Sequence, residues 1–292
     1  MKPHAGTAPL LVLAAVISVQ FGGALAATLV PRIGAAGSVT LRLAFATLVL
    51  LVVARPRLRG HASGSWRTVA LFGHALGGMN LAFYASLAHL PIGVAVTIEF
   101  LGPLTLAAFQ SRRGRDWIAV AAATGGVVLV SGALETTWAE LDRVGILLAA
   151  ITGVLWAAYI VLSQRTGREF EKLEGLALAM VVATLAVLPL GLPSVGSWSG
   201  EILGIGFAIA ILSSVLPYSL ELVALRHLRQ QVFGILLSLE PAVAALAGFL
   251  VLHQVLDTAQ LVGMVGVVAA SVIVLGDRRR ARRPDPAEAT ST

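Results

Sequence analysis

The feature that most constrains this chain is a series of long apolar stretches separated by short polar connections. About 20 apolar residues in an α-helix cross the roughly 30 Å hydrocarbon core of a bilayer. Ten windows of about that length cover residues 10–29, 37–54, 68–88, 92–110, 117–132, 144–164, 175–192, 202–225, 232–252 and 258–276. Hydrophobic residues make up 57% of the 292-residue chain, and a soluble surface could hardly accommodate that fraction. The sequence therefore predicts an all-α membrane protein with ten transmembrane helices.

The basic residues predict the orientation of these helices. With the N terminus in the cytoplasm, the connections after the even-numbered windows and the tail carry RPRLRG, SRRGR, RTGREFEK, RHLRQ and DRRRARR. All of the 21 Lys and Arg residues except Arg32, Arg42 and Arg143 then lie on the cytoplasmic side. Cytoplasmic loops are enriched in these residues, so both termini are predicted to be cytoplasmic. A cleaved signal peptide at the first window is disfavoured, because it would leave nine spans with reversed loop charges.

Composition also argues against several classes of function. The chain has no cysteine, so disulfides and thiolate metal sites are absent. It carries no phosphate-binding glycine loop and no HExxH or GxSxG pattern, and we expect neither an enzyme nor a bound cofactor or metal. The net charge of +6 lies in loops and in a basic tail at 277–292, which we expect to be disordered and to contact anionic lipid rather than nucleic acid. The oligomeric state stays open, and a homodimer is compatible with the sequence.

A weak internal repeat divides the chain into two halves. HLPIGVAVTIEFLGP at 89–103 aligns with HLRQQVFGILLSLEP at 227–241, at a constant offset of 138 residues. Beyond these segments Asp116 aligns with Asp257, and Gly125 with Gly266. Each half holds an odd number of spans, so the second copy enters the membrane from the opposite face. We expect two inverted five-helix repeats, 1–138 and 139–276, an architecture in which secondary transporters bind substrate near the midplane and alternate access.

Three glutamates lie inside predicted spans, where an ionisable side chain usually faces a polar cavity or a partner. At 1.5 Å per residue, Glu99 should lie about 12 Å from the outer boundary, and Glu240 at about the same depth from the inner boundary. Glu240 precedes Pro241 and Glu221 follows Pro217, so these two could instead satisfy backbone groups that a proline kink frees. Burial disfavours the charged carboxyl, so each is also a candidate for proton exchange near neutral pH.

Other polar residues in the windows extend the candidate path. Arg42 is the only cation in a predicted span. It could be the counter-ion of a glutamate or of a substrate carboxylate, a structural ion-pair partner, or a side chain that reaches the membrane interface. Polar side chains also recur at helical spacing and offer amide, hydroxyl and ring contacts to a small zwitterion, although hydrogen bonding between helices explains the same spacing. These are Asn80 and Tyr84; Thr152, Trp156, Tyr159 and Ser163; and Ser214, Tyr218 and Glu221.

Four segments from both halves resemble a known family. They read NLAFYASLAHLPIGVAVTIEFLGPL, GVLWAAYIVLSQRTG, LSSVLPYSLELVALRHL and FGILLSLEPAVAALAG. With the ten-span layout they resemble the drug/metabolite transporter superfamily, with an EamA-type domain in each half, and within it the threonine and homoserine exporters of bacterial inner membranes. The resemblance implies efflux of small amino acids in exchange for protons, through a central cavity enclosed by spans one, three, four, six, eight and nine, with spans five and ten outside it. By position it places near that path Asn80, Tyr84, Glu99, Trp156, Tyr159, Tyr218, Glu221 and Glu240.

One segment departs from the family pattern. The ninth window ends in LHQ at 252–254, where the family usually has LGE. Any role of an acidic residue at the outer mouth is therefore in doubt. We expect an inner-membrane exporter of small amino acids that works by alternating access, with Glu99 sensing the proton and the substrate ammonium group. Two alternatives remain open: a carrier of the same fold that moves cationic drugs or other metabolites without protons, and a membrane scaffold or sensor in which the glutamates only lock helices together.

Overall fold

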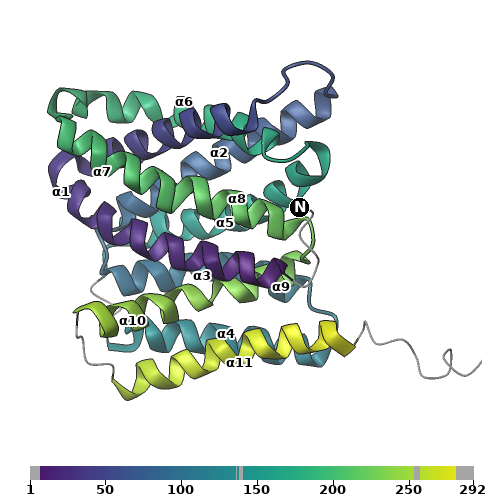
Figure 1. Cartoon of the computed structure of the whole chain (residues 1–292). Helices are drawn as coiled ribbons and strands as arrows, with labels where there is room; N and C mark the ends of the chain where they lie inside the picture. Colours follow the sequence, from purple (N-terminus) through teal and green to yellow (C-terminus); the bar gives the residue numbers. More distant parts are fainter. Residues whose placement is uncertain (1–6, 136, 138–140, 253–256, 281–292) are drawn as a thin grey trace, which may run out of the picture.

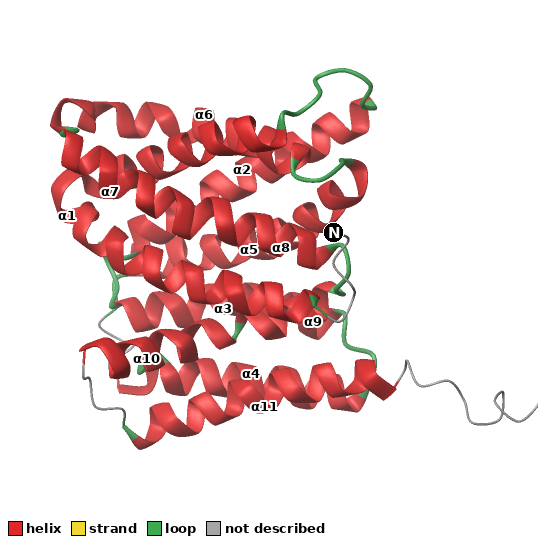
Figure 2. Ribbon diagram, viewed as in Figure 1, coloured by secondary structure: helices red, strands yellow, loops and turns green. Residues whose placement is uncertain are grey.

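The computed structural model describes the chain except residues 1–6, 136, 138–140, 253–256 and 281–292. The described residues are helical and hold no strand (Figure 2). In order, the elements are α1 (Ala8–Ala54), α2 (Ser63–Ser86), α3 (Ile92–Phe109), α4 (Gly114–Val130), η1 (Ala133–Glu135), α5 (Arg143–Glu169), α6 (Glu174–Gly191), η3 (Leu192–Ser197), α7 (Gly200–Ala210), η4 (Ile211–Val215), α8 (Leu216–Leu225), α9 (Gln230–Leu237), α10 (Leu239–Leu252) and α11 (Thr258–Arg280).

Within this described part, six helical segments are long and apolar enough to cross a membrane. They are Thr28–Ala54, Ile92–Phe109, Arg143–Glu169, Glu174–Ser197, Gly200–Leu225 and Thr258–Leu275, and two shorter apolar helices cover Ala8–Gly23 and Gln230–Leu246. The helices run side by side in one bundle, and α1 begins at the same end of the bundle at which α11 finishes (Figure 1). The predicted all-α membrane class is confirmed.

The predicted windows fall on described helices, but the breaks between and within them differ from the prediction. The first two windows join in α1, whose only non-helical residue is Gly34, with φ 74° and ψ 169°. Glycine adopts this conformation without a Cβ clash, so one residue suffices where a loop was expected. The window at 202–225 contains the π-helical turn η4 just before Pro217. The helix in the window at 232–252 breaks after Leu237. Pro241 has no N–H, so it cannot donate the helical hydrogen bond to the carbonyl of Leu237.

Packing joins the two halves of the chain. The α2 helix packs against α5 and α6, α1 packs against α6, α7 and α8, α3 packs against α5 and α9, and α4 packs against α11. Glycines permit the closest approaches: a Cβ added at Gly102 would lie 1.9 Å from the carbonyl oxygen of Gly153, and one at Gly73 would lie 2.5 Å from that of Ala179. Small residues therefore allow the helices to approach closely at these positions.

Candidate functional site

A polar network lies buried between α1, α2, α5 and α8. The Arg42 guanidinium on α1 donates to the Asn80 side-chain oxygen on α2. Asn80 Nδ2 donates to the Leu76 carbonyl at 2.8 Å and to the Tyr218 hydroxyl on α8 at 3.0 Å. From α5, the Tyr159 hydroxyl donates to Glu221 Oε2 at 2.7 Å. Each of Arg42, Asn80, Tyr159, Tyr218 and Glu221 is at most 8% exposed, so the network is shielded from solvent.

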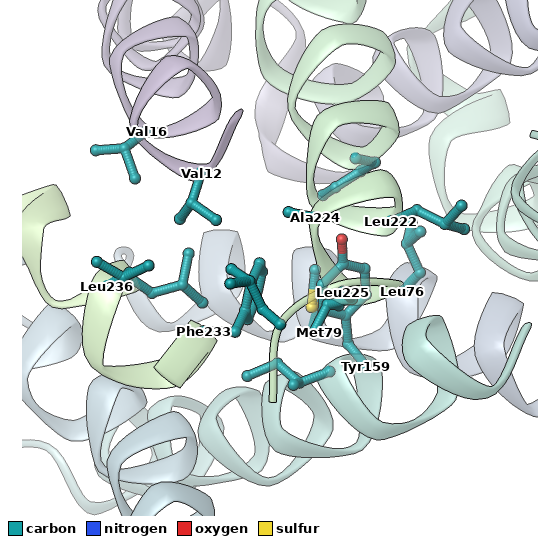
Figure 3. Packing of buried hydrophobic residues seen from close by; sticks show 14 of the residues in the cluster. Val12, Val16, Leu76, Met79, Tyr159, Leu222, Ala224, Leu225, Phe233 and Leu236 are labelled. Atoms are coloured by element: carbon teal, nitrogen blue, oxygen red, sulfur yellow. The ribbon is translucent and has the colours of Figure 1, made fainter. Parts of the chain in front are cut away.

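Aromatic rings connect the two hydrogen-bonded groups. The rings of Tyr159 and Tyr218 lie 5.6 Å apart between centroids, and the Tyr159 ring also packs on Phe72. Figure 3 shows Tyr159 among apolar side chains, with its hydroxyl oxygen directed toward α8. The Arg42 guanidinium lies 5.4 Å from the centroid of the partly buried Tyr84 ring. Six of the predicted site residues therefore belong to one group, namely Arg42, Asn80, Tyr84, Tyr159, Tyr218 and Glu221.

The remaining predicted residues lie beside this group. Trp156 is partly buried and packs on Phe100, the residue that follows Glu99, with ring centroids 4.7 Å apart. Glu99 is 8% exposed, whereas Glu240 is partly exposed at the start of α10. Glu240 lies within electrostatic range of Glu99 and of Glu221. The three carboxyl groups are therefore linked through Glu240.

Arg42 forms no ion pair in the described part of the chain. Within the described part of the chain, the ion pairs join Arg32 to Glu201, His61 to Glu174, His89 to Asp142 and Arg165 to Glu169, and none includes Arg42 or an intramembrane glutamate. Arg42 is 5% exposed and its Nε has no hydrogen-bond partner. Its guanidinium is therefore buried without a described carboxylate partner.

Several functional candidates were missed by sequence reasoning. Buried hydroxyls without a described partner occur at Ser38, Ser213 and Ser219, in addition to those of the predicted stripes at Ser163 and Ser214. Ser38 lies four residues before Arg42, so helical spacing from this arginine could have found it. Ser213 lies in η4, a π-helical turn, and such turns are frequent at functional sites. The turn has no local sequence signal comparable to Pro217.

A cluster of glutamines links α3, α5 and α9. Gln110, directly after α3, donates to Gln230 on α9 at 2.5 Å, and Gln230 donates to Gln164 on α5 at 2.9 Å. Gln164 in turn donates to the carbonyls of Leu225 and Leu228, at 3.0 Å and 2.9 Å. A polar cavity of about 350 Å³ adjoins these residues. The sequence had not indicated this cluster, because its members lie on separate helices.

Charged residues near the helix ends add further links between the elements. Partial burial raises the pKa of Asp116, but hydrogen bonds from the Gln231 side chain and from the backbone of Arg112 and Arg113 outweigh it and hold that pKa below its usual value. At the opposite end, the N–H of Val144 and the paired His89 lower the pKa of Asp142, which caps α5. These carboxylates therefore tie α4 to α9 and α5 to the end of α2.

Comparisons with known proteins show the family to which the chain belongs. The EamA-like transporter family profile matches residues 143–276. The threonine/homoserine exporter RhtA of Salmonella typhimurium (strain LT2) is 38% identical over 265 residues, covering 90% of this chain and 89% of the relative. RhtA of Escherichia coli (strain K12) is 38% identical over 264 residues with the same coverage. Protein PecM of Dickeya dadantii is 27% identical over 236 residues, covering 75% of this chain and 78% of PecM.

The fold agrees as well. A protein of known crystal structure superposes with a TM-score of 0.78 at 19% sequence identity, covering 95% of this chain and 99% of the other. The residues at 253 and 254, where the chain departs from the LGE pattern, lie outside the described residues. On its identity to these exporters over nine-tenths of its length and on the family match in its second half, the chain belongs to the EamA-like transporter family.

Proposed function

We propose that the chain exports threonine, homoserine or a similar small amino acid across the bacterial inner membrane by alternating access, in exchange for protons. The observation that carries the proposal is the buried network itself. It has a cation, Arg42, at one end and a carboxyl group, Glu221, at the other, joined by hydrogen-bonding and aromatic side chains. A zwitterion presents the complementary pair of charges. The names of the relatives at 38% identity support the substrate class.

The path is proposed to lie between two inverted five-helix repeats, 1–138 and 139–276, which together make ten spans. Asn80 and Tyr218, joined by a hydrogen bond, are 138 residues apart, the same offset as the sequence repeat. Equivalent positions of an inverted repeat meet on the two-fold axis that relates the copies. Helix packing supports this relation. The α2 helix contacts α5 and α6, and the corresponding contacts of the other copy join α1 to α8 and to α7.

Alternating access requires a seal that opens and closes. A buried apolar cluster includes Val12, near the start of α1, together with Leu225 and Phe233 (Figure 3). The glutamine cluster adjoins it, because Gln164 donates to the carbonyl of Leu225. With the N terminus in the cytoplasm, this arrangement closes the path on the cytoplasmic side. Loading substrate from the cytoplasm then requires α9 to move away from α3 and α5.

The proposed orientation can be tested because the chain has no cysteine. Leu58, before α2, and Leu134, in η1, are 68% and 67% exposed, which makes them a matched pair. In intact cells, a membrane-impermeant maleimide should label L134C, whereas L58C should react only after permeabilisation. The positive charges around Leu58 are the reason for this expectation. The opposite labelling pattern would reverse the orientation.

The proposed activity is tested with purified protein in liposomes preloaded with radiolabelled threonine. We expect release that accelerates when a pH gradient is imposed, because the carboxyl groups on the path exchange protons. Release that ignores the gradient would instead support the uncoupled carrier. If neither threonine nor homoserine, nor any other amino acid, is released, then the amino-acid exporter is rejected in favour of other cargo or of the scaffold alternative.

A further inference from the structure

Arg42 is a buried cation whose charge is not compensated by the described part of the chain. Its side chain is 5% exposed, its terminal nitrogen donates to the neutral oxygen of Asn80, and its Nε finds no partner. Burying an ionised group without an opposite charge costs a large amount of free energy. For the same reason, a protein is destabilised when one partner of a buried ion pair is removed. The arrangement is therefore one that an anion would complete.

The guanidinium is held in a fixed position. Asn80, which accepts its hydrogen bond, is itself fixed by donating to Leu76 and to Tyr218. The guanidinium carbon lies over the Tyr84 ring, 5.4 Å from its centroid, a favourable cation–π arrangement. With a terminal nitrogen bound to Asn80 and Tyr84 beside the group, the Nε–H is left to donate to a ligand.

A second unpartnered polar group lies close to Arg42 in the sequence. Ser38 is 4% exposed, and its hydroxyl has no partner among the described residues. It precedes Arg42 by four residues in the same helix, and residues at this spacing are neighbours on one helix face. A carboxylate has two acceptor oxygens, so it can take one hydrogen bond from each of these donors, and the bond from the guanidinium is charge-assisted.

We propose that Arg42 and Ser38 form the subsite for the α-carboxylate of the transported amino acid. This rests on the proposed function for the identity of the ligand. The carboxylate completes the charge of Arg42, and the amino group of the same molecule then points along Tyr218 toward Tyr159 and Glu221. The subsite makes the free acid the recognised form and rejects the amide, which offers no negative charge.

The test measures binding, so it does not depend on transport. Purified protein in detergent is heated with L-threonine, L-threoninamide or sodium chloride at matched concentrations, and the rise in melting temperature is recorded. Wild-type protein should respond to threonine and not to threoninamide. R42Q should need at least roughly thirtyfold more threonine for the same rise, as expected when one partner of a buried charge pair is removed. S38A should weaken the response in the same direction but less.

Matched variants separate this role from a general loss of structure. Arg32 lies on the same helix but is 38% exposed and paired with Glu201, so R32Q should respond to threonine as the wild type does. R42K keeps the charge and should retain preference for the acid over the amide. If R42Q fails to fold, then R42K and S38A carry the test.

Three results would overturn the subsite. The first is that R42Q still distinguishes threonine from threoninamide as well as the wild type does. The second is an equal response of the wild type to threonine and threoninamide. The third is a response to chloride as large as that to threonine, which would assign Arg42 to an inorganic anion. The proposed function fails separately. Protein that binds threonine through Arg42 but releases none from liposomes keeps the subsite and loses the exporter.

Discussion

Replacing Gly102 by alanine should force α3 away from α5 and abolish transport. A Cβ at this position would lie 1.9 Å from the carbonyl oxygen of Gly153 and 2.4 Å from its carbonyl carbon. These are backbone atoms, which cannot rotate out of the way. Overpacking a well-packed interior typically destabilises by about 1–3 kcal/mol and by more when the backbone must shift, so we expect a loss of at least about 3 kcal/mol. The measurements are the melting temperature in detergent and threonine release from liposomes.

The matched control is the same substitution at Gly204 on α7. Nothing lies within 4 Å of a Cβ at that position, and alanine favours a helix over glycine by about 1 kcal/mol. G204A should therefore melt at or above the wild-type temperature and keep its transport. A wild-type melting temperature for G102A would show that α3 and α5 do not meet at Gly102. This contact matters for the site, because Gly102 lies one turn beyond Glu99 on α3.

The helices were predictable from the sequence because long apolar runs leave a membrane-embedded backbone no alternative to hydrogen bonding within the helix. The irregular points were predictable only in part. Proline marks the break near Pro241, since it removes a donor from a known position. In contrast, neither the break at Gly34 nor the π-helical turn η4, which packs against α1, has a local signal of this kind. A local pattern carries no information about such contacts.

The same distinction holds for the candidate site. Asn80 with Tyr84, and Tyr218 with Glu221, could be grouped in advance because each pair shares a face of one helix. The partners across helices could not be assigned, because spacing along the chain does not say which face meets which. The hydrogen bond from Arg42 to Asn80 and the glutamine cluster both required the packed structure.

Replacing Glu99 by glutamine should uncouple transport from the pH gradient. Glutamine has the shape of the protonated acid but cannot release a proton, so it holds the site in one charge state. We expect gradient-driven release of threonine to fall at least tenfold, about 1.4 kcal/mol in the barrier. Exchange of threonine across the membrane at equal pH should stay within about threefold of wild type, because it needs no net proton movement. Glu171 is exposed in the connection after α5, and E171Q is the control that should change neither rate.

The two rates together separate the roles that Glu99 can have. If Glu99 carries the proton, E99Q loses only the gradient-driven rate. If Glu99 binds the substrate ammonium group, both rates fall, because a neutral amide replaces a charge-assisted hydrogen bond. If Glu99 only joins helices, both rates persist and the melting temperature falls. An unchanged pH profile in E99Q removes Glu99 from coupling and leaves Glu221 and Glu240, which share its electrostatic environment, as the carboxyl groups that can carry the proton.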